Sequence, residues 1–158
     1  MEQIFAADER EAWAVQLQRP FELASPFSGA GFALLLAVYD PSVTDDEQAR
    51  LSERFVAEGC RYAVCTGDRC SSWDDAIDTA YLASEPDFQP SDATFVMTTW
   101  HEEEPLGDVA EFFMRSARFD GFEPRRFLAV CVGGDEACFA RLRDAVRTQL
   151  RLTSEPRR

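Results

Sequence analysis

The sequence has no apolar run near the roughly 20 residues that a membrane-spanning helix needs. Its opening, MEQIFAADEREAW, is acidic and lacks the basic-then-apolar order of a signal peptide. These absences predict a cytoplasmic protein that does not enter membranes. Lysine and asparagine are also absent, so all 16 basic residues are arginine. Because both missing residues have A-rich codons, we expect a GC-rich bacterial genome.

The sequence lacks the motifs that are typical of nucleotide-binding proteins and of common hydrolases. There is no GxGxxG, no GxxxxGK[ST] and no GxSxG nucleophile elbow. Among the loops after predicted strands, only Gly133-Gly134 is glycine-rich, and Asp135 follows it at once. A phosphate at a helix start prefers free backbone amides without a neighbouring carboxylate. Nucleotide binding is therefore not expected unless a divalent cation mediates it.

Positive charge is scarce. The chain has 16 basic and 29 acidic residues, which gives a formal net charge of −13. Nucleic-acid binding depends on cations that neutralise phosphates, so a nucleic-acid partner is not expected. The charge suits a protein partner with a basic surface, or a bound cation.

Five cysteines, an odd number, are spread along the chain. The spacing of Cys65 and Cys70 is not the two-residue gap of zinc or redox motifs. We expect five reduced thiols. Cys131 and Cys138 should be poorly accessible, whereas Cys65 and Cys70 should lie near a loop edge and react first.

Apolar strands alternate with amphipathic helices over residues 32–151. The predicted strands are Phe32–Tyr39, Arg61–Thr66, a third within Ala93–Trp100 and Phe127–Val132. Four β-α units of this kind predict an α/β fold in three layers, with a mostly parallel four-stranded sheet and right-handed crossovers. Rossmann-like and flavodoxin-like strand orders both fit. We expect residues 1–158 to form a single domain.

Residues 1–31 precede these units and are expected to form an N-terminal helical arm. A helix is predicted around Asp8–Leu17, because Trp13 and Leu17 have the i, i+4 spacing of one helix face. The stretch that follows contains Pro, Ser and Gly and is expected to be an irregular connection. The arm should pack on the outside of the main unit.

The stretch Ala93–Glu104 is expected to be a central strand that delivers a polar cluster to its carboxyl end. If Phe95–Thr99 is this strand, Phe95, Val96 and Met97 should be buried on both faces. His101, the only histidine, should lie beyond the covered part. Ligands of open α/β sheets bind at that edge. The residues assigned there to partner binding are Asp40, Asp68, Trp73, Asp74, Asp75, Trp100, His101, Glu102, Glu103, Glu104 and Asp135. Matching of acids to helix dipoles is the alternative explanation of the acidic pattern.

Catalytic chemistry at the same edge would use Cys65, Asp68 and His101. If the second and third predicted strands are neighbours, His101 could meet Cys65 or Cys70 as a thiol–imidazole pair or a zinc site. No metal-ligand set is assigned, because sequence does not show which side chains are adjacent.

Two segments, CTGDRCSSWDDAID and FVMTTWHEEEPLGDVAEFF, resemble a family of small, uncharacterised bacterial α/β proteins. The resemblance covers about the middle half of the chain. It implies that the loops after the second and third predicted strands are the distinctive part, and it brings no activity with it.

Two hypotheses follow. The first is a non-enzymatic protein, comparable to immunity proteins or antitoxins, that binds a basic protein partner through the acidic edge and needs no cofactor. The alternative is a small enzyme or ligand-binding domain at the same edge, based on Cys and His or on a divalent metal held by carboxylates. The sequence leaves the oligomeric state open.

Overall fold

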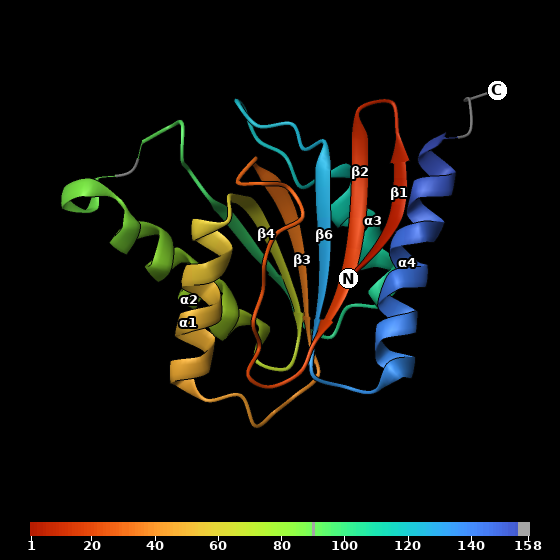
Figure 1. The fold of residues 1–158 in the computed structure, drawn as a ribbon, viewed down its shortest axis with the longest axis horizontal. Helices are drawn as coiled ribbons and strands as arrows, with labels where there is room; N and C mark the ends of the chain where they lie inside the picture. Colours follow the sequence, from red (N-terminus) through yellow and green to blue (C-terminus); the bar gives the residue numbers. More distant parts are fainter. Residues whose placement is uncertain (90, 155–158) are drawn as a thin grey trace.

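The computed structural model describes residues 1–89 and 91–154, in which a six-stranded mixed sheet lies between two layers of helices (Figure 1). The elements in chain order are β1 (Glu2–Ala7), β2 (Arg10–Leu17), β3 (Phe32–Val38), α1 (Asp45–Ala57), β4 (Cys60–Gly67), α2 (Cys70–Ser84), the short 3₁₀ helix η1 (Pro86–Phe88), β5 (Met97–His101), α3 (Leu106–Arg115), β6 (Arg126–Val132) and α4 (Glu136–Ser154). None of these helices is long and apolar enough to cross a membrane.

The strand order is β1-β2-β6-β3-β4-β5. All neighbours from β2 to β5 pair in parallel, and only β1 runs antiparallel to its neighbour. The α/β class and the four β-α units from β3 to α4 are as predicted. The four-stranded parallel sheet is corrected to six mixed strands, because the N-terminal segment adds two.

The N-terminal helical arm is wrong: residues 2–17 form a β-hairpin. Asp8 and Glu9 connect β1 and β2 and have φ values of 53° and 63°, as both central residues of a type I′ turn require. The helix was predicted from the spacing of Trp13 and Leu17. That interval is an even number of residues, so it places both side chains on one face of a strand just as well.

One face of the sheet is covered by α1 and α2. Phe55 from α1 and Trp73 and Ile77 from α2 pack in one cluster with Leu34 and Leu36 of β3. The connection after β2 also contributes to this cluster through its apolar side chains Phe21, Leu23 and Phe27. The connection therefore completes the core rather than lying outside it.

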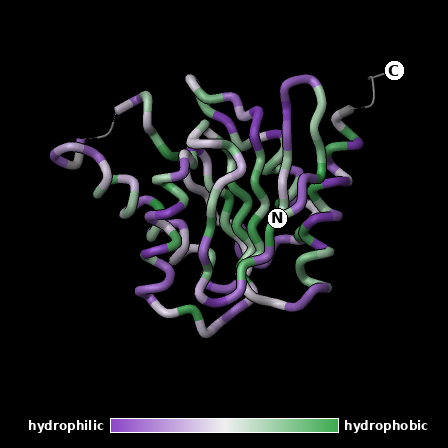
Figure 2. The backbone as a smooth tube through the Cα atoms, viewed as in Figure 1, coloured by the Kyte–Doolittle hydropathy of each residue, from purple (hydrophilic) through white to green (hydrophobic). Residues whose placement is uncertain are grey.

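The other face is covered by α3 and α4. Phe113 from α3 and Leu142 and Val146 from α4 pack with Leu35 of β3. Every residue of β3 is buried, as expected for a parallel strand covered on both faces. Figure 2 shows hydrophobic residues concentrated along the central strands and hydrophilic ones on the outer sides of the helices and in the loops.

The stretch predicted as the central strand is an edge strand. β5 begins at Met97, after Phe95 and Val96, and β4 is its one partner strand among the described residues. Its exposure fits an edge position, since Met97, Thr98 and Thr99 are only partly buried. The strand between the two halves of the sheet is β6, which pairs with β2 on one side and β3 on the other.

Candidate functional site

The carboxyl ends of β3 and β6 form the topological switch point, because α1 leaves β3 toward one face and α4 leaves β6 toward the other. The chain itself supplies a cation here. Arg19 donates from Nε to Oε1 of Glu47 at 2.7 Å, and its Nη1 lies 3.6 Å from Oδ2 of Asp40. The hydrogen bond from Arg19 lowers the pKa of Glu47 to about 2. The acids at this point therefore have an internal partner.

The Gly133-Gly134 loop at the same point is closely packed. A Cβ on Gly133, whose φ is 68°, would lie 2.4 Å from Cβ of Asp40, so only glycine fits there. Asp135 accepts a hydrogen bond from the backbone N–H of Cys138 at 2.9 Å, which lowers the pKa of its carboxyl. Asp135 thus caps the start of α4, as the helix-dipole interpretation expects.

Asp68 lies beside an arginine as well. The Arg69 guanidinium is 3.4 Å from Asp68 and also donates to the carbonyl oxygen of Val43 at 2.6 Å. Three of the acids assigned to partner binding, Asp40, Asp68 and Asp135, are thus engaged within the molecule.

The proposed cluster of Cys65, Cys70 and His101 does not form. Cys65 and Cys70 lie in the core on the α1–α2 face, whereas the His101 ring stacks on Phe112 of α3 on the opposite face, with ring centroids 4.6 Å apart. Burial raises the pKa of Cys65 well above its ordinary value and also raises that of Cys70, so neither thiol is poised as a thiolate. The thiol–imidazole pair is therefore wrong.

The described residues 1–89 and 91–154 contain no preformed cluster of metal ligands. No group of three or more His, Cys, Asp or Glu side chains there is arranged to hold an ion. The five cysteines are free thiols, and four of them are buried. The most accessible is Cys138 rather than Cys65 or Cys70, which corrects the expected order of reactivity.

Two residues assigned to partner binding are inside the molecule. Trp73 is 0% exposed and Asp74 is 5% exposed, so neither can contact a partner in this conformation. Asp74 faces the sheet with Asp78, and Thr98 of β5 donates from Oγ1 to Asp78 at 3.0 Å. Burial raises the pKa of both carboxyls. Asp75, between them in sequence, is exposed.

His101 is buried rather than beyond the covered part, with 8% exposure. Its Nδ1 lies 2.8 Å from Oε2 of Glu104, and its Nε2 lies 3.1 Å from Oγ1 of Thr99. Thr99 also bonds the Tyr62 hydroxyl. These contacts hold the β5–α3 loop against the sheet. Glu103 lies in this loop and has a φ of 57°.

Trp100 points the other way and is 54% exposed. Among the described residues, the large hydrophobic side chains with such exposure are Met1, Leu82, Trp100 and Leu152, so Trp100 is the aromatic one. Glu102, Glu103 and Glu104, which begin two residues after Trp100, are also exposed. In the described part of the chain, Glu102 and Glu103 form no ion pair. We call Trp100 and these three glutamates the Trp100 surface.

The outer side of β5 is open. Within residues 1–89 and 91–154 no strand pairs with it, so it leaves backbone groups free beside the Trp100 surface. The other edge strand, β1, has an irregular register between Gln3 and Phe5 and contacts α4 through Glu2, which pairs with Arg147 at 2.8 Å. β5 therefore has an unpaired edge next to an exposed tryptophan.

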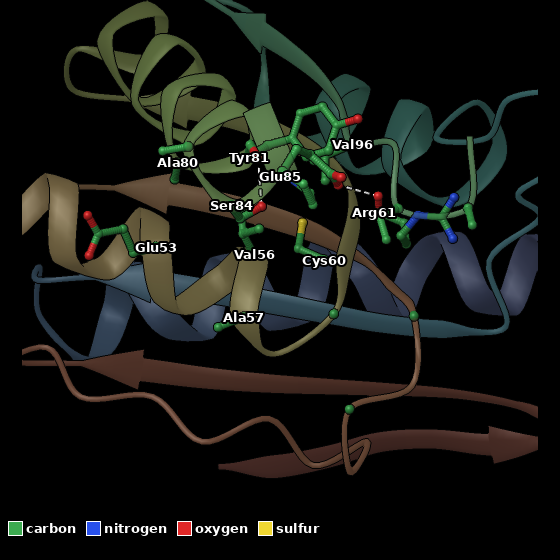
Figure 3. Close-up of a pocket in the computed structure, with 17 residues that line it drawn as sticks. Glu53, Val56, Ala57, Cys60, Arg61, Ala80, Tyr81, Ser84, Glu85 and Val96 are labelled. Atoms are coloured by element: carbon green, nitrogen blue, oxygen red, sulfur yellow. Dashed lines mark hydrogen bonds between the residues drawn. The ribbon is translucent and has the colours of Figure 1, made fainter. Parts of the chain in front are cut away.

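Sequence reasoning missed the hydroxyl groups of this strand. The alternation along β5 could have revealed them, because Thr98 and Trp100 share one face while Thr99 and His101 share the other. It also missed a cavity at the opposite, amino-terminal edge of the sheet (Figure 3).

The chain matches a family model over most of its length. A family model described as "Domain of unknown function (DUF7684)" covers residues 12–149, from within β2 to within α4, and so includes all four β-α units and the Trp100 surface. No curated protein matches the chain.

Proposed function

We propose that this chain, which belongs to the family described as a domain of unknown function (DUF7684), binds a basic protein partner through the Trp100 surface. In its most concrete form, the protein is comparable to an immunity protein or antitoxin that masks a basic toxin. The observation that carries the proposal is the exposure of Trp100 at the end of an edge strand, beside acids without ion pairs.

Trp100 has the properties of an interface anchor. Tryptophan is enriched among the few residues that dominate binding energy, because it removes a large area from water on association. An exposed edge strand offers a second means of attachment, because a partner strand can hydrogen-bond to it. The two features adjoin, since Trp100 is a residue of β5.

Charge selects the kind of partner. Arg19 and Arg69 engage Asp40 and Asp68, but Glu102 and Glu103 remain available to a partner. With a net charge of −13, the chain repels other acidic surfaces, including a second copy of itself. A basic partner would be steered toward this surface and would bind more weakly as salt rises.

The test compares Trp100→Ala with Leu82→Ala, which removes another exposed apolar side chain from a different part of the molecule. Each protein would be used to capture partners from the lysate of its own cells, and the captured protein would then be purified for titration. We expect Trp100→Ala to weaken binding about 30-fold or more, as a hot-spot residue does. We expect Leu82→Ala to bind like the unmodified protein. Equal affinities for the two variants would refute the assignment of the surface.

Charge reversal supplies an independent check. Glu102→Arg with Glu103→Arg should weaken association with the purified partner and reduce its dependence on salt. Glu22→Arg with Asp120→Arg changes the net charge equally at exposed positions elsewhere. If the two double variants lose affinity equally, net charge rather than the Trp100 surface governs binding.

One observation favours an enzyme as the second candidate. Thr99, His101 and Glu104 form a hydroxyl–imidazole–carboxylate series, with separations of 3.1 Å and 2.8 Å. In an ester hydrolysis, Thr99 Oγ1 would attack the carbonyl carbon while its proton passes to His101 Nε2, and Glu104 would stabilise the imidazolium. The bond to the leaving alcohol would then break as His101 returns the proton to it, and a water molecule activated by His101 would release the acyl group as a carboxylic acid and restore the Thr99 hydroxyl.

Hydrolysis of p-nitrophenyl acetate tests this second candidate. Thr99→Val should reduce the rate about 100-fold or more, whereas Thr98→Val, on the other face of β5, should not. Turnover that survives Thr99→Val, or that never exceeds the buffer rate, would remove the enzyme hypothesis.

A further inference from the structure

The outer edge of β5 is long enough to pair with one added strand. β5 spans the five residues Met97–His101, and β4 is its one partner strand within residues 1–89 and 91–154. In that part of the chain, no loop or turn forms a backbone–backbone hydrogen bond with these five residues. Every second residue of such an edge strand directs its N–H and C=O groups outward, where an extended segment of another protein can pair with them.

On the side of this edge that faces α2, the side chains are aromatic and acidic. Thr98 and Trp100 share this face of β5, and Thr98 donates to Asp78 of α2 at 3.0 Å. Asp78 is partly buried, and Asp75, one turn before it, is exposed. Neither carboxylate forms an ion pair in the part of the chain that the structure describes. Because partial burial of a carboxylate without a cation is unfavourable, Asp78 would gain from a basic group of a partner.

On the side that faces α3, the same edge is mainly apolar. Met97 and Thr99 share this face of β5, and Thr99 bonds the hydroxyl of Tyr62 on the neighbouring β4. The rings of Phe112 and Phe119 lie beside Tyr62, with centroids 6.3 Å and 6.5 Å from that of the Tyr62 ring. Both phenylalanines are only partly buried. This side therefore offers apolar contacts to an added strand.

The two sides select opposite residue types. Residues that pair directly on neighbouring strands place their side chains on the same face of the sheet. Every second residue of an added strand would thus lie on the α2 side, where a basic side chain can pair with Asp78 and lie on the Trp100 ring. The residues between them would lie on the α3 side. A cation is disfavoured there, because Arg61 already lies over the Phe119 ring, 5.6 Å from its centroid.

We propose that the edge of β5 receives an extended segment of the partner in which basic and apolar residues alternate. This inference rests on the proposed function, because it names the part of the partner that binds beside Trp100. Alternation along β5 places two basic side chains on the α2 side and three apolar ones on the α3 side. The net charge of −13 favours such a segment. The β5 strand of a second copy does not fit, because its sequence MTTWH contains no arginine.

Three capped pentapeptides test the pattern: Val-Arg-Val-Arg-Val, Val-Val-Val-Arg-Arg, and the first peptide with N-methylated backbone amides. In calorimetric titrations at low ionic strength, the alternating peptide should bind with a Kd of about 1 mM or tighter. The block peptide has the same charge but cannot sort its side chains onto the two sides, and the methylated peptide cannot donate to β5. Both should bind at least about tenfold more weakly. Equal binding of the three, or no binding of the alternating peptide, would overturn the proposal.

Variants locate the binding on the protein. Asp75→Asn with Asp78→Asn removes both carboxylates but keeps an amide oxygen that accepts from Thr98, and it should weaken the alternating peptide about tenfold. Glu22→Gln with Glu53→Gln changes the net charge equally at exposed positions elsewhere and should leave binding unchanged. Circular dichroism checks that each variant is folded. Equal losses in the two double variants would show that net charge alone attracts the peptide, and the proposal would fail.

Trp100→Ala separates this inference from the proposed function. The exposed side chain can be removed without unfolding the protein, and its loss should weaken the alternating peptide about tenfold. A captured partner that requires Trp100, combined with peptides that show no preference for alternation, would refute strand addition alone. A captured partner that ignores Trp100→Ala would refute the proposed function, whatever the peptides do.

Discussion

Replacing His101 tests how the β5–α3 loop is held. His101→Ala removes the contacts of the imidazole with Glu104 at 2.8 Å and Thr99 at 3.1 Å, and it removes the ring stacked on Phe112. Each hydrogen bond contributes about 1 kcal/mol net, and the ring contact contributes about 0.5–1.5 kcal/mol. We therefore expect a loss of about 3 kcal/mol in the free energy of unfolding.

Thermal and urea unfolding followed by circular dichroism measure this loss. For a chain of this size, about 3 kcal/mol corresponds to a decrease in Tm of about 6–12 °C. Glu102→Ala is the matched control, because Glu102 is exposed in the same loop and should change stability by less than about 0.5 kcal/mol.

A double-mutant cycle tests whether Thr99 and His101 stabilise the protein through their shared hydrogen bond. Thr99→Val removes the hydroxyl that bonds both His101 and Tyr62 and should cost about 1–2 kcal/mol. Combined with His101→Ala, its effect should be smaller by about 1 kcal/mol, because the shared hydrogen bond is lost only once. If His101→Ala costs no more than Glu102→Ala, the imidazole does not hold the loop and the assignment is wrong.

Three further outcomes are expected. The hydrogen bond from Arg19 lowers the pKa of Glu47 from 4.5 to about 2. The stability that Glu47 contributes is therefore present above pH 4.5 and is lost as pH falls from there toward 2. In urea titrations over this range, the free energy of unfolding should fall less with pH in Glu47→Gln than in the unmodified protein. Burial raises the pKa of Asp74 above 3.8, so its contribution to stability falls as pH rises through the raised pKa. Asp74→Asn should therefore stabilise the protein by about 1 kcal/mol at pH 7. An unchanged midpoint of urea unfolding would contradict this. Titration of the native protein with a thiol reagent should show one fast thiol that is lost in Cys138→Ser and kept in Cys65→Ser; a fast phase that follows Cys65 would mean that α2 is open in solution.

The β-α units could be predicted because their signals are local. Phe32–Val38 is apolar throughout and is buried throughout. Thr44 and Glu47 have the sequence spacing of a capping box, and they form one at the start of α1. The N-terminal hairpin was missed because the same apolar spacing satisfies a helix and a strand. Its turn uses Asp8 and Glu9 at positive φ, without the glycine that usually indicates such a turn.

The candidate site could be predicted only in outline. The acids at the carboxyl edge are visible in sequence, but the arginine that neutralises Asp40 comes from a distant segment. Residue type alone does not indicate which of Trp73 and Trp100 is exposed. Trp73 was assigned to partner binding, although its i, i+4 spacing with Ile77 on α2 is that of one helix face, and both are buried. The exposure of Trp100 depends on β5 lying at the edge of the sheet. Strand order is set by long-range pairing, which no local pattern encodes.

The position of β6 has a consequence for how the chain assembles. β6 follows the five other strands in the chain, yet it lies between β2 and β3 and pairs Glu11 with Arg126 and Ala33 with Phe127 (Figure 1). Until it has been synthesised, the hairpin and the β3–β4–β5 portion share no hydrogen-bonded strand. The nascent chain therefore exposes two apolar strand edges on the ribosome, and contacts of such long range make the final joining step slow.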